Sequence, residues 1–81
     1  MIYKLKSDPA AEAVHDALPQ AISEELSLAL ATACDDPLAS TDPYGEDDPI
    51  VRTLVTPRTT SVLLIGHTLK TVTVLQITYL G

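Results

Sequence analysis

The chain opens with IYKLK at positions 2–6, where apolar and charged residues alternate and both lysines fall on the same side. A period of two is typical of a β-strand with one wetter face. Asp8 and Pro9 come next. An aspartate before a proline favours a helix start, because its carboxylate can accept a hydrogen bond from a free backbone N–H and proline has none to leave unpaired. The pattern predicts a strand followed at once by a helix.

The next two segments follow the helical period of 3.6 residues. We expect the first helix over 9–18, because Pro19 disfavours the α conformation in the residue before it. Proline also suits the opening of a helix, so a second helix is expected from that point to the acidic residues at 35. Each segment has one apolar stripe and one polar face, the pattern of a helix packed on a core. The stripes comprise Ala10, Ala11, Val14 and Leu18 in the first helix and Ile22, Leu26, Ala29, Leu30 and Ala33 in the second.

From Ile50 onward the sequence changes to β-branched residues, which favour strands. Strands are expected in IVRTLVT at 50–56, SVLLIGHT at 61–68 and TVTVLQITYL at 71–80, with a turn between the last two over Gly66 to Lys70. Strands joined by short connections must be largely antiparallel, and two helices with single stripes need one sheet face to cover. The sequence predicts an α+β two-layer sandwich: an N-terminal strand, a helical hairpin and three largely antiparallel strands, in one domain over residues 1–81.

Residues 35–49, DDPLASTDPYGEDDP, hold six carboxylates and three prolines. They show no periodicity, so we expect a long loop there. Of the 11 Asp and Glu residues in the chain, the other five balance the five Lys and Arg, so this stretch carries the whole net charge of −6. An EF-hand register starting at Asp42 fails, because acids stand in a row at 46–48 where the ligands must alternate. We expect a solvated acidic loop and no metal.

The composition restricts the compartment and the chemistry. The single cysteine, Cys34, excludes an internal disulfide and a cysteine-rich zinc site, so we expect a reducing cytoplasm. Its place at the end of an apolar helix favours a small core residue. No apolar run approaches the roughly 18 residues of a membrane span, and we expect neither export nor membrane insertion. No phosphate loop or dinucleotide motif is present, so no cofactor and no small-molecule ligand is expected.

The element order and the apolar spacing resemble a known superfamily over nearly the whole chain. The matching pieces are IYKLKSDPAAEAV, LPQAISEELSLALATACDDP, VRTLV, TTSVLLIG and TVTVLQIT. They are similar to the RelE/ParE superfamily of small bacterial toxins from type II toxin–antitoxin systems. The resemblance implies a cytoplasmic bacterial toxin-like protein with an antitoxin as partner. It further implies either ribosome-dependent mRNA cleavage or inhibition of DNA gyrase.

The chain departs from that superfamily in three ways. Where members carry an arginine before a V-x-Y run, this chain places Ser61, and it stops soon after Tyr79 where relatives continue into a basic tail. Its pI of about 4.5 also has the wrong sign for entering a ribosome, since Lys and Arg supply most of the affinity for RNA phosphates. A divergent, non-catalytic interaction module that kept the fold is therefore the alternative interpretation.

Cleavage of RNA by its own 2′-hydroxyl needs a base, an acid and a cation over the phosphate. Arg52 and Arg58 are the cations near the strand edges, and His67 could move a proton near neutral pH. Tyr79 could orient or donate. These four are the candidate catalytic residues if the chain is a ribonuclease, a point that the sequence alone leaves open.

Each candidate also has a structural interpretation. Arg52 could face outward and pair with Asp47 or Asp48 just upstream. His67 could be a polar turn residue without a positioned partner. Tyr79 could be a half-buried packing residue whose hydroxyl reaches water. Arg58, which follows a proline in a turn, is the more open of the two arginines.

Overall fold

A computed structural model describes residues 2–45 and 48–81 of the chain. It contains helices and a mixed sheet, which confirms the predicted α+β class. The elements run in the order β1 (Lys4–Ser7), α1 (Pro9–Ala17), α2 (Gln20–Asp35), α3 (Pro37–Ser40), β2 (Asp42–Pro43), β3 (Val51–Val55), β4 (Thr59–Gly66) and β5 (Thr71–Tyr79).

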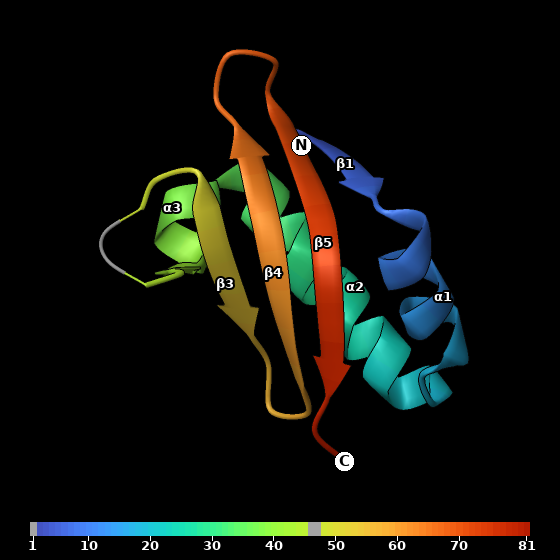
Figure 1. Ribbon diagram of the computed structural model, residues 1–81. Coiled ribbons are helices and arrows are strands. Elements are labelled where there is room, and N and C mark those ends of the chain that lie inside the picture. Colours follow the sequence, from blue (N-terminus) through green and yellow to red (C-terminus); the bar gives the residue numbers. More distant parts are fainter. Residues whose placement is uncertain (1, 46–47) are drawn as a thin grey trace.

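The sheet has 5 strands in the order β1-β5-β4-β3-β2, so β4 is the middle strand. The strands β2 to β5 pair antiparallel, as predicted for the last three, and β1 pairs parallel with β5. The register of β4 against β5 shifts between Val62 and Leu63, which marks a bulge. Figure 1 shows β3, β4 and β5 side by side with β1 at one edge.

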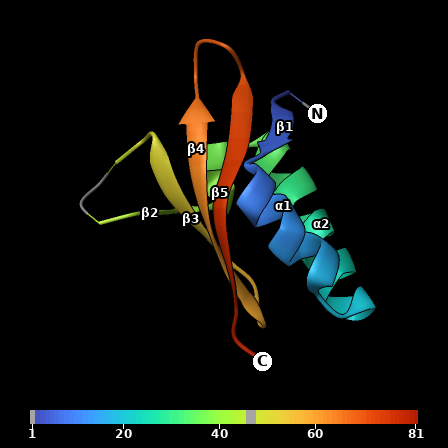
Figure 2. The ribbon, with the colours of Figure 1, turned by 45° about the vertical axis from the view of Figure 1, so that its right-hand side comes forward.

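All the helices lie on one side of the sheet (Figures 1 and 2). Between these layers lies an aliphatic core, as the composition predicts. The predicted stripe of α2 is confirmed in its centre, since Leu26, Leu30 and Ala33 are buried. The stripe of α1 is wrong at Ala10 and at Val14, which are exposed, whereas Ala11 and Leu18 are buried. The strands contribute Leu54, Leu63, Ile65, Val72, Val74 and Ile77.

Two local signals in the sequence produce the geometry they predict. Asp8 caps α1, because its carboxylate accepts a hydrogen bond from the backbone N–H of Ala10 at 3.1 Å. Gly66 ends β4 where the predicted turn begins. A Cβ there would lie 2.5 Å from Oγ1 of Thr71, so only glycine fits without displacing that side chain.

The prediction of a long loop over 35–49 is wrong for much of its length. Asp35 is the last residue of α2, and the residues that follow form α3 and β2. The reason is the same capping signal that begins α1: Asp36 precedes Pro37, and its carboxylate accepts from the backbone N–H of Ala39 at 3.3 Å. Glu46 and Asp47 lie outside the described residues. No helix in the described part of the chain is long and apolar enough to cross a membrane.

Candidate functional site

Arg52 points to the helix side of the sheet and is 7% exposed. Its Nε donates to Oγ1 of Thr41 at 2.9 Å, and its Nη2 donates to the carbonyl oxygens of Thr41 at 2.6 Å and Leu38 at 3.1 Å. Its Nη1 donates to the carbonyl oxygen of Asp48 at 3.3 Å. The guanidinium thus ties β3 to α3 and to the segment that leads into β3.

The outward orientation in the structural interpretation of Arg52 is therefore wrong, as is its ion pair with Asp48; a pair with Asp47 lies outside the described residues. The side chain faces inward, and the Asp48 group that it contacts is the backbone carbonyl, not the carboxylate. That carboxylate instead accepts from the backbone N–H groups of Ile50 at 2.8 Å and Val51 at 3.2 Å. The cause is that the carbonyls of the α3 region need donors once they are buried, and a guanidinium carries five.

Arg58 and Tyr79 lie together at one end of the sheet. Arg58 is exposed in the connection between β3 and β4, and its carbonyl oxygen accepts from the N–H of Leu80 at 2.8 Å. Tyr79 pairs with Thr59 at the beginning of β4 and is 43% exposed. Its half-exposed position fits both the packing role and the catalytic role that the sequence allowed.

His67 lies at the opposite end of β4. Its Nε2 is 2.7 Å from the carbonyl oxygen of Pro49, so Nε2 carries the proton and donates. Its Nδ1 then accepts from the hydroxyl of Tyr3 at 3.3 Å. The ammonium of Lys70 lies 5.2 Å from the centre of the Tyr3 ring. His67 therefore has positioned partners and joins the N-terminal segment to the turn after β4.

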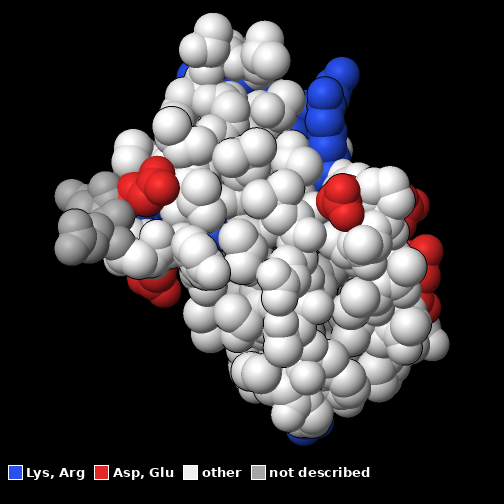
Figure 3. Space-filling model, in the orientation of Figure 1, with Lys and Arg blue, Asp and Glu red and all other residues white. Residues whose placement is uncertain are grey.

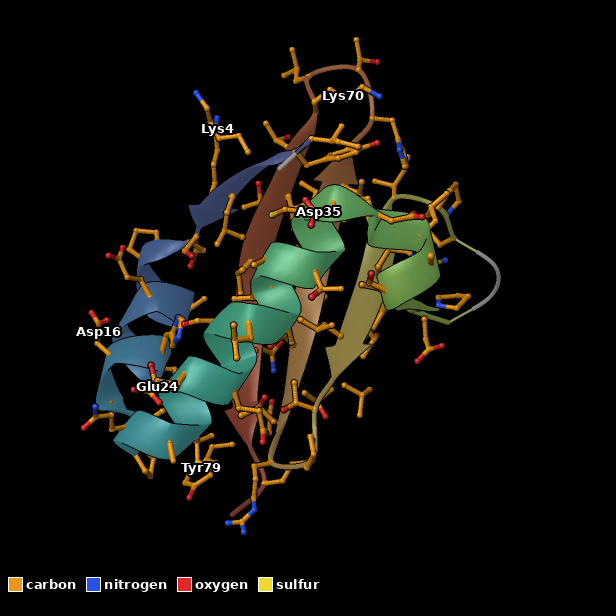
Figure 4. The ribbon with its side chains drawn as sticks, turned by 180° about the vertical axis from the view of Figure 1, so that it is seen from behind. Lys4, Asp16, Glu24, Asp35, Lys70 and Tyr79 are labelled. Atoms are coloured by element: carbon orange, nitrogen blue, oxygen red, sulfur yellow. The ribbon has the colours of Figure 1, made fainter. Side chains whose placement is uncertain are left out.

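The four candidate residues do not form one site. The 8 residues of β4 separate the end with Arg58 and Tyr79 from the end with His67 by about 23 Å at the usual rise of a strand. Figure 4 shows this separation, with Lys70 of the turn at one end of the sheet and Tyr79 at the other. Arg52 is buried on the helix side between them. No single phosphate can be reached by all four.

Ser61 replaces the expected arginine at a position that does not face out of the molecule. It is 0% exposed on the helix side of β4, and its hydroxyl oxygen is buried without a hydrogen-bond partner in the described structure. Its neighbours on the other side of the strand are Thr60 and Val62, which are uncharged. This part of β4 therefore lacks a charged residue whether the family's arginine is aligned with Thr60, Ser61 or Val62.

The sheet surface turned away from the helices is hereafter the open face. Its centre, from β3 to β5, has no ionisable side chain, and most of it is white in Figure 3. Lys4 and Lys6 of β1 pair with Thr71 and Thr73, so they stand on the open face at one edge, while Asp42 of β2 stands at the other. Its central residues are Val51, Thr53, Val55, Thr60, Val62, Leu64, Thr71, Thr73, Leu75, Gln76 and Thr78.

Sequence reasoning did not single out this face. The signal was present in the alternation of TVTV at 71–74 and of the lysines in the first strand. Such alternation tells which residues share a face, but only the pairing of β1 with β5 shows that Lys4 and Lys6 join the threonines of β5. That pairing is parallel and spans most of the chain, so no local pattern predicts it.

Cys34 is 0% exposed at the end of α2, as expected for a small core residue. Burial raises the pKa of its thiol, and the negative charge of Asp35 raises it further. The neutral thiol is therefore favoured, which argues against a nucleophilic role.

The remaining polar groups offer little further chemistry. A shallow hollow on the outside of α2 is lined by Ser23, Glu24, Ser27 and Leu28. Nε2 of His15 is 3.4 Å from the carbonyl oxygen of Ser23 and 3.2 Å from Oγ of Ser27. Since the carbonyl can only accept, Nε2 carries the proton and cannot act as a base toward Ser27. Within residues 2–45 and 48–81, no group of three or more His, Cys, Asp and Glu could hold a metal ion.

No protein-family model and no curated protein sequence matches the chain. Solved structures do match it over nearly its full length. The toxin–antitoxin complex RelBE2 from Mycobacterium tuberculosis aligns with a TM-score of 0.84 and 16% identity, over 98% of this chain and 99% of that chain. The isolated RelE toxin of E. coli gives 0.82 and 17%, over 98% and 85%. The archaeal RelE–RelB complex from Pyrococcus horikoshii gives 0.74 and 12%, over 100% and 98%.

These likenesses show that the chain has the fold of the RelE toxins, which confirms the fold that the sequence resemblance implied. At these identities they concern the fold, and fold does not fix activity.

Proposed function

We propose that the chain is a toxin-like component of a bacterial type II toxin–antitoxin pair that binds an antitoxin and acts through protein contacts rather than by cleaving RNA. The antitoxin part is supported by the fold, because solved proteins of this fold occur in toxin–antitoxin complexes. The free, buried thiol of Cys34 suits the reducing cytoplasm in which such a pair would meet. An antitoxin segment would lie along the helices or a sheet edge.

One observation carries the second part: the two candidate arginines do not share a site, and the lysines lie at the β1 edge and in the turn after β4. Arg52 is buried and hydrogen-bonded to backbone carbonyls, Arg58 is at one end of the sheet, and Lys70 is at the other. A ribonuclease must hold a cation over the phosphate and further cations along the backbone. A surface with an uncharged centre suits a protein partner better, and DNA gyrase inhibition or simple complex formation would need only such contacts.

A ribonuclease is the second candidate, and its support is the closeness of Arg58 to Tyr79. An exposed guanidinium and a half-exposed phenol at one end of the sheet could hold a phosphate and donate a proton. This pair lacks a histidine, since His67 is at the far end. The ribonuclease proposal thus reduces to two of the four residues that the sequence indicated.

Expression in bacteria, with and without the small reading frame that neighbours the gene, tests the toxin–antitoxin proposal. We expect the chain alone to arrest growth and the neighbour to relieve the arrest and to copurify with the chain. High soluble yield, normal growth and no copurifying neighbour would reject the antitoxin pair altogether.

Arg58→Ala then separates the mechanisms. If the chain acts through protein contacts, growth arrest occurs without transcript cleavage and persists in this variant. Loss of arrest together with loss of cleavage would favour the ribonuclease. Lys70→Gln is the matched control, because it removes one cation at the other end of the sheet and should leave either outcome unchanged. DNA damage with intact transcripts would point to gyrase.

A further inference from the structure

The open face has an uncharged centre and opposite charges at its two edges. Its apolar residues are Val51, Val55, Val62, Leu64 and Leu75; Val55 is 60% exposed and Leu64 38%. The other central positions are threonines and one glutamine, whose methyl and methylene groups also pack well on a sheet. No described element covers this surface, since the helices all lie behind the sheet (Figure 2).

The edge charges are fixed by the register of the strands. Residues that pair across neighbouring strands form rows that run across the sheet. One row contains Lys6, Thr73 and Leu64, and the row of Lys4 contains Thr71. Asp42 stands in the row that passes through Thr53 and Val62. Figure 3 shows blue over β1 and red at the side of β3, with a further red patch just below the blue one. Asp8 follows at the β1 edge, but its carboxylate is held by the N–H of Ala10.

We propose that the open face binds a second copy of this chain, as a symmetric dimer whose two-fold axis runs along β4. This strand is the middle one of the sheet, so rotation about it lays β5 and β1 of one copy over β3 and β2 of the other. The basic edge of each copy then faces the acidic edge of its partner. Leu64 and Val62 meet their own counterparts near the axis, as an isologous interface requires.

The charges select this arrangement over the alternative. A two-fold axis across the strands would place Asp42 against Asp42 and the lysine edge against itself, which is repulsive. In the proposed arrangement Lys6 and Asp42 of the partner differ by one row, about 7 Å along the strand. A lysine side chain is long enough to span that offset.

The net charge of −6 does not prevent this approach. Described acidic residues such as Glu12, Asp16 and Glu24 lie on the helices, on the other side of the sheet. At physiological ionic strength, exposed charges more than about 8 Å apart are largely screened. The lysines and aspartate at the edges of the face therefore dominate its local field.

The size of the face predicts a weak dimer. Five strands about 4.8 Å apart and a central strand of 8 residues give a footprint of about 500 Å² per copy. A standard specific interface buries about 800 Å² per partner. The dimer should therefore form and dissociate with concentration, and it needs no antitoxin.

Sedimentation velocity of the chain alone, from the low micromolar to the submillimolar range, tests the inference. We expect the mean mass to rise toward that of a dimer. Leu64→Lys should weaken association by about a hundredfold or more, because the substitution occurs twice near the axis. Leu28→Lys, at a 72% exposed position on α2, is the matched control and should leave association unchanged. A monomer at every concentration would overturn the proposal, as would equal weakening by both variants.

Charge reversal tests the arrangement itself. Asp42→Lys and Lys6→Asp should each weaken the homodimer by about tenfold, whereas a mixture of the two variants should restore association in a heterodimer. Restoration supports the axis along β4, and failure of restoration overturns it. If the chain alone stays monomeric while Leu64→Lys abolishes antitoxin capture, the face belongs to the antitoxin and the dimer is rejected, with the toxin–antitoxin proposal intact.

Discussion

The helix side and the open face of strands β3, β4 and β5 have different roles in the molecule. On the helix side, Leu63, Ile65 and Val72 are at most 2% exposed and pack under α2. On the open side, residues one step along the same strands, such as Leu64, remain in contact with water. One face holds the fold together, and the other is free to contact something else.

That difference agrees with the proposal that this RelE-like fold acts without RNA chemistry. The core depends on apolar side chains with a period of two, and nothing in that pattern requires a charged residue on the other face. The open face can therefore lose its cations at little cost in stability. Function in this chain must be sought in what the open face and the helices contact, not in the core.

The largest expected effect separates the two faces directly. Leu63→Ala should lower the free energy of unfolding by about 2 to 5 kcal/mol, because it leaves a cavity under α2. Leu64→Ala, one residue further along β4, should cost less than about 1 kcal/mol. Urea unfolding followed by circular dichroism measures both. Equal costs would show that the open face is packed against something in the isolated chain.

The two arginines allow a second comparison, between the buried Arg52 and the exposed Arg58. Arg52→Met should cost about 2 to 4 kcal/mol, because it leaves the buried carbonyl oxygen of Thr41 and the partly buried one of Leu38 without this donor. Arg58→Met, at an exposed cation, should cost less than about 0.5 kcal/mol. Thermal unfolding of the two variants provides the measurement. An Arg52→Met protein of full stability would contradict its anchoring role and reopen the catalytic one.

The thiol of Cys34 should have a smaller effect, on how the free energy of unfolding changes with pH. Its pKa is raised in the folded state by burial, and by the charge of Asp35 as well. The thiol therefore makes its full contribution to stability below the pKa of the unfolded thiol, about 8.5. This contribution is lost as the pH rises through the higher pKa of the folded thiol. The free energy of unfolding should fall more steeply at alkaline pH in the wild type than in Cys34→Ala. Parallel pH profiles would contradict the shift.

Reactivity of the same thiol provides an independent check. Iodoacetamide near neutral pH should label Cys34 slowly in the folded chain and rapidly in denaturant, because the side chain is 0% exposed. Rapid labelling without denaturant would mean that the end of α2 opens readily.

The sequence was informative where the signal is local. The aspartate–proline pair at Asp8 and Pro9 predicted the start of α1, and the glycine at 66 marked the turn after β4. The same pair occurs at Asp36 and Pro37, yet the acidic composition around it obscured the short helix α3. A capping signal acts within one turn, so it outweighs the average composition of the segment.

The candidate site could not be predicted, because it depends on contacts between distant residues. Arg52 carries the charge typical of an exposed strand residue, but it shares the helix side of β3 with Leu54, where its guanidinium donates to Thr41. His67 finds its partners at Tyr3 and Pro49, which the sequence gives no reason to connect. Four residues of types suited to RNA cleavage were present, and only the sheet register shows that the two ends of β4 keep His67 apart from Arg58 and Tyr79.

The most direct test of the central claim is a cleavage assay with the purified chain on translating ribosomes, read out by primer extension on the bound mRNA. We expect intact transcripts at micromolar concentrations of the chain. Cleavage that is lost in Arg58→Ala and retained in Lys70→Gln would contradict the claim that this RelE-like fold acts without RNA chemistry.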